Sequence, residues 1–545
     1  MATHSENISP LSRLFKLLQL EKKDIFIIVM LTFGAGFLAL ATPIAVQTLV
    51  NIVAMGNVVQ PLIVVSLMLF LLLLLAGGLS LLEYYVVELI QRRIFVRNAL
   101  QAAAQAQSMH VTVRDTQNPV ELMNRFFDVS TVQKTSYQLL TKGLGAVLQA
   151  IVGSFVLIFY SVYFGLGVLI LFLITWFIVT IIGRVAVNSA IQESYAKYEV
   201  AAWLETIGRN LNMFKFGSSQ DYAMQRADEL ASNYLDRRKK HFATLYKQNM
   251  VATFIYALAG TVMLGLGGWL VMKGQINLGQ FVAAELIIFG VLSAFLSFIS
   301  KLEYFYDLLA GLDKLGIIQD LPSEKQGGYS LQVTQAYSLE ASKVLLPNSL
   351  RQSSVSLKLA SGESLAILAE DDGAKTILAE LLVGLRNPLA GVVKINDSDI
   401  RHLDLSSMRH HVAFIGHVEI LEESILANLT LQHPETSLNE VNSILNTLGL
   451  ADAIAAMPKG LDTVLLPTSV AVTHTQARML MIARALLMKP HLIVVDSLLD
   501  GLHGDALNNA CRALQSSQNG WSLIVITSIH DIASRFNAVL ELGDT

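Results

Sequence analysis

Long stretches of this chain carry no charged residue, and they restrict its fold more than any other feature. Four such stretches are free of charge and a fifth contains one acid, Glu285: Ile25–Val50, Pro61–Leu82, Gly143–Gly183, Val251–Met272 and Gln275–Ser300. A helix needs about 20 apolar residues to cross a bilayer core about 30 Å thick. The third stretch is long enough to cross twice, with a turn at Tyr163–Gly165. We therefore predict six membrane-spanning helices.

Basic residues gather on one side of these spans. The outer turns, about Asn51–Gln60, Ser161–Gly165 and Lys273–Gly279, hold one basic residue, Lys273. The other side holds many, including the run Arg237–Lys240. Because positive charge is retained on the cytoplasmic side, we place both termini in the cytoplasm and the chain in the cytoplasmic (inner) membrane.

The segment before the first span has a pattern of its own. Ile8–Leu20 has the apolar spacing of an amphipathic helix, which we expect to lie on the lipid of the inner leaflet. Ala39–Ala41 is similar to a signal-peptide cleavage site, but the apolar run continues well past it. We therefore favour a membrane span over a signal peptide.

Composition divides the chain into two parts. Of the 545 residues 53% are hydrophobic and 15% charged, and the apolar excess ends near Pro322. We predict a transmembrane domain over 1–321 and a soluble domain over 322–545. The net charge of −4 gives no indication of nucleic-acid binding, and the single cysteine, Cys511, predicts no disulfide.

A damaged phosphate-binding motif marks the soluble part. Ala369–Thr376 has the spacing of a P-loop, G-x-x-x-x-G-K-[ST], with Lys375 and Thr376 in place and Ala369 and Ala374 at the glycine positions. Gly373 is retained beside Ala374, whereas three acids, Glu370–Asp372, occupy the part that would cradle a triphosphate. Acids there repel phosphate, at roughly a few kcal/mol for each close contact at an effective dielectric of ~20.

Further elements follow at regular spacing. A strand, Ser364–Leu368, enters the P-loop, and a helix, Thr376–Gly384, leaves it. His491–Asp496 is a buried strand that ends in a carboxylate, where P-loop proteins place the Asp that orients magnesium. We also predict strands at Val412–Ile415 and Ser522–Thr527.

With these elements the chain resembles an ABC exporter half-transporter of the bacterial peptide and protein-secretion branch. The resemblance covers essentially the whole chain and implies an α-helical six-span membrane domain fused to an α/β P-loop cassette. Val271–Gln280 matches the turn before the sixth span of such exporters. The family works as a dimer in which ATP and magnesium lie between one P-loop and the partner's signature segment. The resemblance therefore implies a homodimer, or a heterodimer with another half-transporter.

The signature segment departs from the family pattern. L-S-G-G-Q falls on Val472–Gln476, so that Thr473 replaces the serine, His474 and Thr475 replace the glycines, and only Gln476 is kept. The glycine N–H groups should cap the γ-phosphate of the partner's ATP, and larger side chains obstruct that approach.

Other catalytic positions are replaced as well. Ser497 follows Asp496 where the family has the catalytic Glu, and a hydroxyl cannot act as the general base for water. Ser528 replaces the switch His, although His530 is near, and Gly416 replaces the Gln of the Gln loop. The D-loop becomes Asp500–His503, and the family's closing helices have no counterpart before Thr545.

Two long cytoplasmic excursions, about Glu83–Lys142 and Arg184–Met250, match the coupling loops of the family. Taken alone, the excursions are best interpreted as two cytoplasmic helical hairpins with no special role. Because a cassette follows in the same chain, we instead expect their tips to dock on the soluble domain. The first contains a break and a short helix at Asn118–Arg125.

Glu285 is the only ionisable residue well inside a span. It is either a substrate or proton contact in the translocation path, or a protonated residue bonded to a neighbouring helix or near the interface, and the close turn Asn277–Gly279 weakens the first alternative.

Two functions therefore stay open. The chain is an exporter subunit that moves a peptide, protein or lipid-like substrate, with a cassette that is inactive by itself and binds ATP and magnesium weakly or not at all. Alternatively, it is a pseudo-ABC membrane scaffold or regulatory subunit of a secretion complex.

Overall fold

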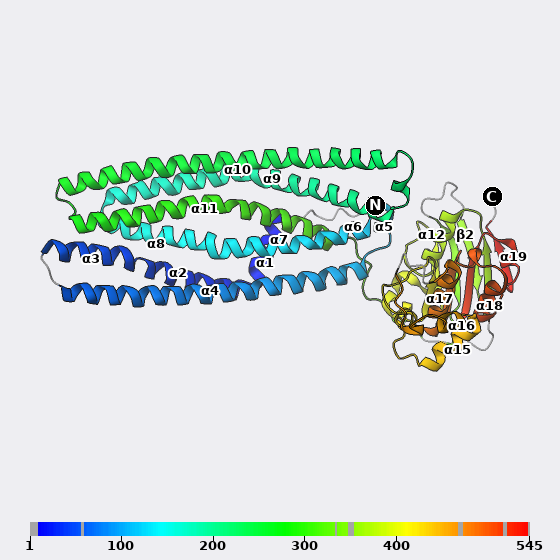
Figure 1. Cartoon of the computed structure of the whole chain (residues 1–545). Coiled ribbons are helices and arrows are strands. Elements are labelled where there is room, and N and C mark those ends of the chain that lie inside the picture. Colours follow the sequence, from blue (N-terminus) through cyan, green and yellow to red (C-terminus); the bar gives the residue numbers. More distant parts are fainter. Residues whose placement is uncertain are drawn as a thin grey trace. The chain divides into compact units, whose positions relative to one another are not determined.

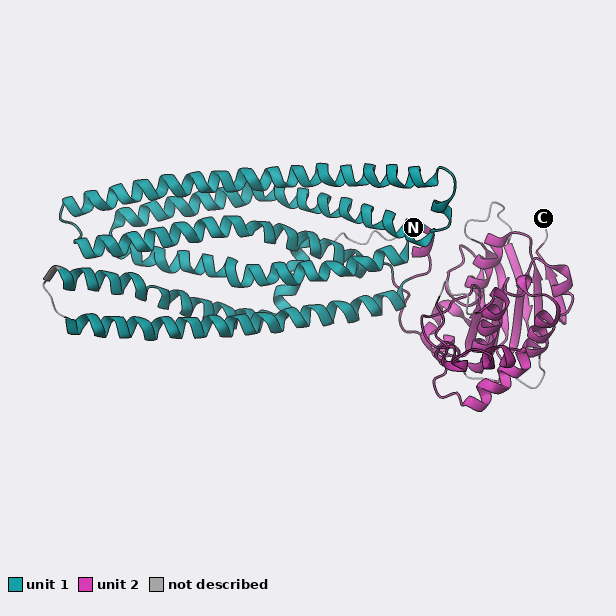
Figure 2. Cartoon of the chain, viewed as in Figure 1, with its two compact units in different colours: residues 1–109, 116–322 teal, residues 110–115, 323–545 magenta. Residues whose placement is uncertain are grey.

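The computed structural model describes residues 9–55, 59–332, 335–346, 354–466, 472–515 and 520–542. Residues 56–58 of the predicted turn Asn51–Gln60 lie outside this part. The chain forms two compact units (Figure 2). Unit 1 comprises 1–109 and 116–322, and unit 2 comprises 110–115 and 323–545. The tip of the first excursion, His110–Asp115, thus belongs with the C-terminal unit.

Unit 1 consists of helices, and its long helices lie alongside one another (Figure 1). Within the described residues six of its helical segments are long and apolar enough to span a membrane, which confirms the predicted six spans. The elements are α1 Pro10–Leu20, α2 Lys22–Ala39, α3 Ala41–Met55, α4 Val59–Ser108, α6 Pro119–Asn124, η1 Arg125–Phe127, α7 Asp128–Gln138, η2 Leu139–Gly143, α8 Leu144–Tyr160, α9 Val162–Arg209, η3 Met213–Lys215, α10 Ser219–Met272 and α11 Leu278–Gln319.

Local sequence explains where the spanning helices break. Leu40 separates α2 from α3, because the ring of Pro43 would clash with the carbonyl group of Ala39, four residues before it, in a continuous helix. The predicted position of the turn, Tyr163–Gly165, is wrong, since these residues belong to α9. The chain turns at Ser161, which has extended backbone and caps α9 by accepting the Tyr163 N–H through its hydroxyl.

The N-terminal segment forms the predicted amphipathic helix. Ser9 caps α1, and Pro10 occupies its first position, where no N–H is needed. Leu14 and Leu17 pack against a buried cluster that includes Leu308 of α11, whereas Phe15 is exposed. The exposed apolar side chains fit a position on the inner leaflet, which stays a prediction.

Unit 2 contains two sheets. One is parallel, with the strand order β6-β7-β8-β3-β9, and the other is antiparallel, with the order β2-β1-β4-β5. The strands are β1 Leu339–Leu345, β2 Ser354–Leu359, β3 Ser364–Leu368, β4 Val392–Ile395, β5 Ser398–Asp399, β6 Val412–Ile415, β7 Leu492–Asp496, β8 Ser522–Thr527 and β9 Ala538–Glu541. The predicted bounds of β3, β6 and β8 are confirmed.

Helices connect the parallel strands and cover both faces of that sheet. Along β7 the side chains of Ile493 and Val495 enter one core, and those of Leu492 and Val494 enter the other. The helical elements of this unit are α5 Val113–Thr116 (whose last residue belongs to unit 1), α12 Asp372–Leu382, η4 Ile400–His402, α13 Leu405–Arg409, α14 Ile425–Thr430, α15 Leu438–Leu448, α16 Ala451–Ala455, η5 Gly460–Asp462, α17 His474–Leu487, η6 Leu499–Gly501, α18 Gly504–Leu514 and α19 His530–Ala533.

One boundary differs from the prediction in a way that matters for the site. The helix after β3 was predicted over Thr376–Gly384, but α12 begins four residues earlier, at Asp372. Part of the expected phosphate-binding loop is therefore the first turn of a helix.

Candidate nucleotide site

The parallel sheet brings the P-loop and the strand-end residues together. The carboxyl ends of parallel strands meet at one edge of a sheet, where ligands bind in folds of this kind. Ala369 follows β3, Asp496 ends β7, and Ser528 follows β8. The strands β7, β8 and β3 are neighbours in register, and the Ala369 N–H donates to the Thr527 carbonyl at 3.0 Å.

Asp371 occupies the amino end of α12. Its Oδ1 accepts from the Gly373 N–H at 2.9 Å and from the Ala374 N–H at 3.3 Å. Free N–H groups at a helix start, together with the helix dipole, form an anion site. Here the anion is a side chain of the chain itself. This cap also explains the early start of α12, because Asp is a preferred N-cap residue.

Lys375 is likewise engaged within the chain. Its side chain is 1% exposed, and its Nζ lies 2.7 Å from Asp372 Oδ1 and 3.9 Å from Asp500 Oδ2. The Asp372 carboxylate is almost fully exposed, and its hydrogen bond from Lys375 lowers its pKa. The lysine that contacts the β- and γ-phosphates in a P-loop protein therefore pairs with acids from its own unit.

Asp500 extends this network to the switch position. Its carboxylate accepts from the Thr527 hydroxyl, and its Oδ2 accepts from the Ser528 N–H at 3.0 Å and the Ser528 hydroxyl at 2.9 Å. Sequence reasoning placed Asp500 in the D-loop without a role. An acid at this place in a pattern does not reveal its partners, so the sequence held no signal for this contact.

Asp496 and Thr376 lie together as the motif predicts. The Thr376 hydroxyl donates to Asp496 Oδ2 at 2.8 Å, and the Ser497 hydroxyl donates to Oδ1 at 3.0 Å. Ser497 has a φ of +53°, a left-handed conformation that costs a non-glycine residue about 1–2 kcal/mol. The residue at the position of the catalytic base is thus strained and faces the acid beside it.

These contacts decide which groups fit. Thr376 and Asp496 are the pair that holds magnesium in P-loop proteins, and they lie within hydrogen-bonding distance of each other. The phosphate side does not fit, because Asp371 satisfies the N–H groups at the helix start and Asp372 pairs with the lysine. A nucleotide phosphate would have to displace both carboxylates.

The signature segment lies on another element, the start of α17, and a capping box begins this helix. The Thr473 hydroxyl accepts from the Gln476 N–H at 3.2 Å, and the Gln476 side chain accepts from the Thr473 N–H at 2.8 Å. This reciprocal capping box satisfies two helix-end groups. His474 and Thr475 form the exposed first turn of the helix.

Gly416 and His417, at the Gln-loop position, line a cavity of about 80 Å³. Thr376 and Asp496 line it as well, together with Arg114 from the tip segment. The Gln-loop position therefore adjoins both the magnesium pair and the tip.

Four charged side chains tie the tip to the cassette. The Arg386 guanidinium donates to the Asp115 carboxylate through two nitrogens, at 2.5 and 2.8 Å. Arg386 also pairs with Glu380 of α12, and Arg114 pairs with the same Glu380. Glu380 is 2% exposed. We call these four residues the tip clamp.

The clamp was missed at the level of sequence, although one signal was present. Glu380 interrupts an apolar run, Ile377–Leu382, and an acid in the buried stripe of a helix requires a buried cationic partner. The hydrogen bond from Arg386 holds the pKa of Asp115 below its usual range, and Asp115 in turn raises the pKa of Arg386.

Comparison with known proteins agrees with this architecture. The model of the ABC transporter transmembrane region matches residues 25–296, and the ABC transporter model of the nucleotide-binding domain matches residues 352–499. The chain belongs to the ABC transporters. One membrane domain joined to one cassette is the organisation of an ABC exporter half-transporter, which confirms the resemblance seen in the sequence.

Individual relatives are distant. The chain is 25% identical to the multidrug resistance protein sirA of Leptosphaeria maculans. This match covers 66% of the chain and 31% of the relative. It is 24% identical to the ATP-dependent lipid A-core flippase of Chromobacterium violaceum, over 59% of the chain and 56% of the relative. It is 21% identical to the alpha-hemolysin translocation ATP-binding protein HlyB of Escherichia coli O157:H7, over 56% of the chain and 45% of the relative. The matched part thus spans between about a third and three fifths of these relatives.

A solved structure shows the same fold. A bacterial Atm1-family ABC exporter with ATP bound superimposes with a TM-score of 0.82 at 18% identity. The superposition covers 96% of this chain and 94% of the other.

The clamp generates a prediction about docking of the tip. Replacing Arg386 by Ala removes both of its hydrogen bonds to Asp115 and leaves the buried Glu380 with Arg114 alone, and removing one member of a buried pair costs about 3–5 kcal/mol. We expect amide hydrogen exchange over 110–115 to accelerate at least about tenfold, a factor equal to about 1.4 kcal/mol. Mass spectrometry of the full chain measures this exchange.

The control is Arg401→Ala, which breaks an exposed pair with Asp399 and should leave hydrogen exchange over 110–115 unchanged.

Docking of the tip should also depend on pH, and the direction follows from the pKa of Asp115. The pKa of Asp115 is lowered in the folded chain, so the stability that Asp115 gives to docking is fully present above the ordinary pKa of an aspartate, about 3.9. This stability is lost only as the pH falls below that value. Opening of the tip between pH 5 and 8 in the unmodified chain would contradict the assignment.

Proposed function

We propose that this exporter subunit does not hydrolyse ATP, because its own carboxylates take the places of nucleotide phosphates. The observation that carries this proposal is the arrangement of Asp371 on the α12 N–H groups and Asp372 on Lys375. Ser497 adds to it, since no general base follows Asp496. ATP and magnesium bind weakly or not at all in this proposal.

The membrane domain supplies the transport function in this proposal. Relatives named as a lipid A-core flippase and an alpha-hemolysin translocation protein support a lipid-like, peptide or protein substrate. Glu285 of α11 is half-buried and has no hydrogen bond or ion pair among the described residues, as expected of a group that contacts a substrate. An apolar cavity of about 280 Å³ between α8, α9 and α11, lined by Trp176 and Phe295, fits a lipid-like chain.

The subunit works as a dimer in the cytoplasmic membrane, with both termini on the cytoplasmic side. The partner is a second copy or another half-transporter, and only a partner with an intact cassette would supply hydrolysis.

One observation favours a second function, that of a non-hydrolysing scaffold or regulatory subunit of a secretion complex. His474 and Thr475 stand at the glycine positions of the signature, in the exposed first turn of α17, so the signature segment is altered as well as the P-loop. This chain would then spoil both composite sites of a dimer, including the one built on an intact partner's P-loop.

The first test is ATP hydrolysis by the purified chain. We expect magnesium-dependent turnover equal to that of Lys375→Ala, because the base, the phosphate cradle and the signature are all altered. Ser497→Glu alone should also stay at this level, since it leaves Asp371 and Asp372 in place. A phosphate-release assay with an intact ABC exporter as positive control measures the rates, and turnover clearly above Lys375→Ala would refute the proposal.

The second test is nucleotide affinity. We expect ATP to bind with a Kd above ~1 mM, that is, with less than about 4 kcal/mol of binding free energy. The triple change Asp371→Ser, Asp372→Gly and Ala374→Gly removes the two carboxylates at the helix start, one of which pairs with Lys375, and it should tighten binding at least about tenfold. Calorimetry measures both, with Asp452→Ser on α16 as a control for the loss of an acid elsewhere. Micromolar binding by the unmodified chain would show that the carboxylates do not block the loop.

The third test separates the exporter from the scaffold. In a complex with an intact half-transporter, the site on the partner's P-loop keeps the partner's own base and needs only the signature of this chain. Repair by Thr473→Ser, His474→Gly and Thr475→Gly should raise the ATPase rate of the complex, whereas Ser497→Glu should not. The reverse pattern would show that the sites are assigned the wrong way round, and no effect of either repair would favour the scaffold.

A further inference from the structure

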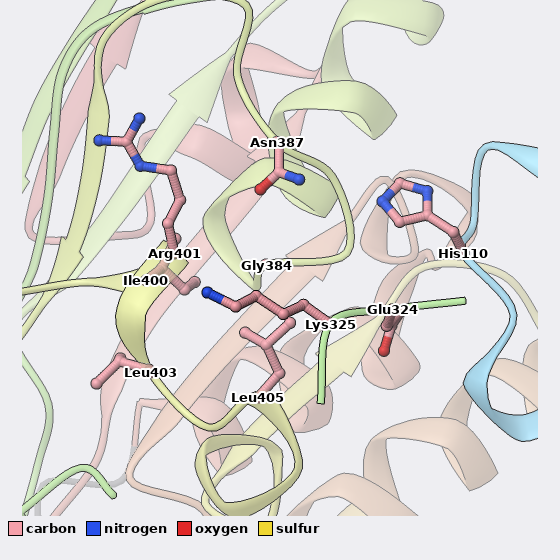
Figure 3. A pocket seen from close by; sticks show the side chains of 9 residues that line it. All are labelled: His110, Glu324, Lys325, Gly384, Asn387, Ile400, Arg401, Leu403 and Leu405. Carbon is pink, nitrogen blue, oxygen red and sulfur yellow. The ribbon is translucent and has the colours of Figure 1, made fainter. Parts of the chain in front are cut away.

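A second cavity lies in unit 2, away from the P-loop. It has a volume of about 260 Å³. His110 of the tip segment lines one side, and Lys325 and Asn387 line others (Figure 3). We call it the tip cavity, because the tip segment supplies part of its wall.

The charges around the tip cavity do not cancel. Glu324 lines it, but its carboxylate accepts two hydrogen bonds from Arg409, at 2.6 and 3.0 Å. Arg401 lines it through its stem, and its guanidinium is paired with Asp399 at 2.6 Å. Lys325 has no ion pair or hydrogen bond among the described residues. One unpaired ammonium group therefore remains after each acid is matched with its arginine.

Two neutral donors face the same space as Lys325. His110 Nδ1 lies 2.8 Å from the Thr112 hydroxyl oxygen and 3.3 Å from the Thr112 nitrogen. In the tautomer in which Nδ1 accepts from both groups, Nε2 carries the ring hydrogen. The Nε2–H has no partner among the described residues. The Asn387 amide also makes no hydrogen bond among the described residues. Figure 3 shows Asn387 above the Lys325 side chain, with the Lys325 ammonium group toward Ile400 and the His110 ring on the other side of the cavity.

The three groups select a class of ligand. An ammonium, an imidazole N–H and an amide NH₂ are donors, and a lysine is a common phosphate ligand. A metal ion does not fit, because the only carboxylate in the wall is already paired with an arginine. A purely apolar ligand would leave all three donors without partners, at a cost in free energy.

We propose that the tip cavity binds a small oxyanion, a phosphate or a phosphate monoester, through Lys325, Asn387 and His110. Because His110 comes from the tip and the other two from the cassette, the anion links the two and strengthens docking of the tip. This site is separate from the P-loop and does not depend on whether the cassette hydrolyses ATP.

The test is calorimetric titration of inorganic phosphate into the full chain in a detergent without phosphate groups. We expect saturable binding with a Kd below about 1 mM, weakened about tenfold by Lys325→Ala and further by Lys325→Ala with Asn387→Ala. Both residues are exposed, so the variants should fold. Lys358→Ala, on an exposed position of β2, should bind phosphate as the unmodified chain does.

Hydrogen exchange reports the link. Phosphate should slow exchange over 110–115 severalfold in the unmodified chain and not in His110→Ala. A second titration uses dihexanoyl phosphatidylglycerol, with dihexanoyl phosphatidylcholine as control, and decides whether a lipid headgroup or free phosphate is the better ligand. The proposal is overturned if neither phosphate nor phosphatidylglycerol binds saturably up to about 10 mM, if the double variant binds as well as the unmodified chain, or if bound phosphate leaves exchange over 110–115 unchanged.

Discussion

The contact between the Asp371 carboxylate and the first N–H groups of α12 determines the character of the cassette. A helix start offers unsatisfied donors and a positive dipole end, and some anion or water must satisfy them. In a phosphate-binding loop that anion arrives with the ligand. Here it is tethered two and three residues from the N–H groups it caps, so the contact is intramolecular and is present without any free ligand. The helix begins at Asp372, directly after the cap, and Lys375 pairs with Asp372 and lies near Asp500.

The same helix carries the second charged feature of the unit. α12 begins at the capped P-loop and presents Glu380 to the tip clamp two turns later. A buried carboxylate shared by two arginines fixes the position of the tip segment relative to this helix. The clamp uses no nucleotide, so docking of the tip does not require an occupied P-loop. This is consistent with a cassette kept as a structural support for the membrane domain.

Much of the fold follows from the sequence because its physical signals are local. Uncharged runs can only be membrane spans, and the buried parallel strands β3, β6 and β8 are short apolar runs with clear ends. The misplaced features depend on single side chains. The start of α12 moved because Asp371 became a cap, and the turn between α8 and α9 fell on Ser161 because that residue caps the next helix.

The candidate site was predictable only in part. The motif identified Thr376 and Asp496 separately, and the structure brings them into hydrogen-bonding contact at the edge of the parallel sheet. The partners of Lys375, the role of Asp500 and the pairing of Asp115 with Arg386 join residues far apart in the sequence. Periodicity and motif spacing contain no information on such contacts.

The backbone at Ser497 has a consequence for any repair of the missing base. The residue directly after β7 is left-handed, and the strain of this conformation comes from the Cβ atom, so serine and glutamate bear it alike. The loop after β7 is held by the bonds of Asp500 to β8 and Ser528. A glutamate at this position would therefore take the direction that this fixed loop gives to its Cβ atom.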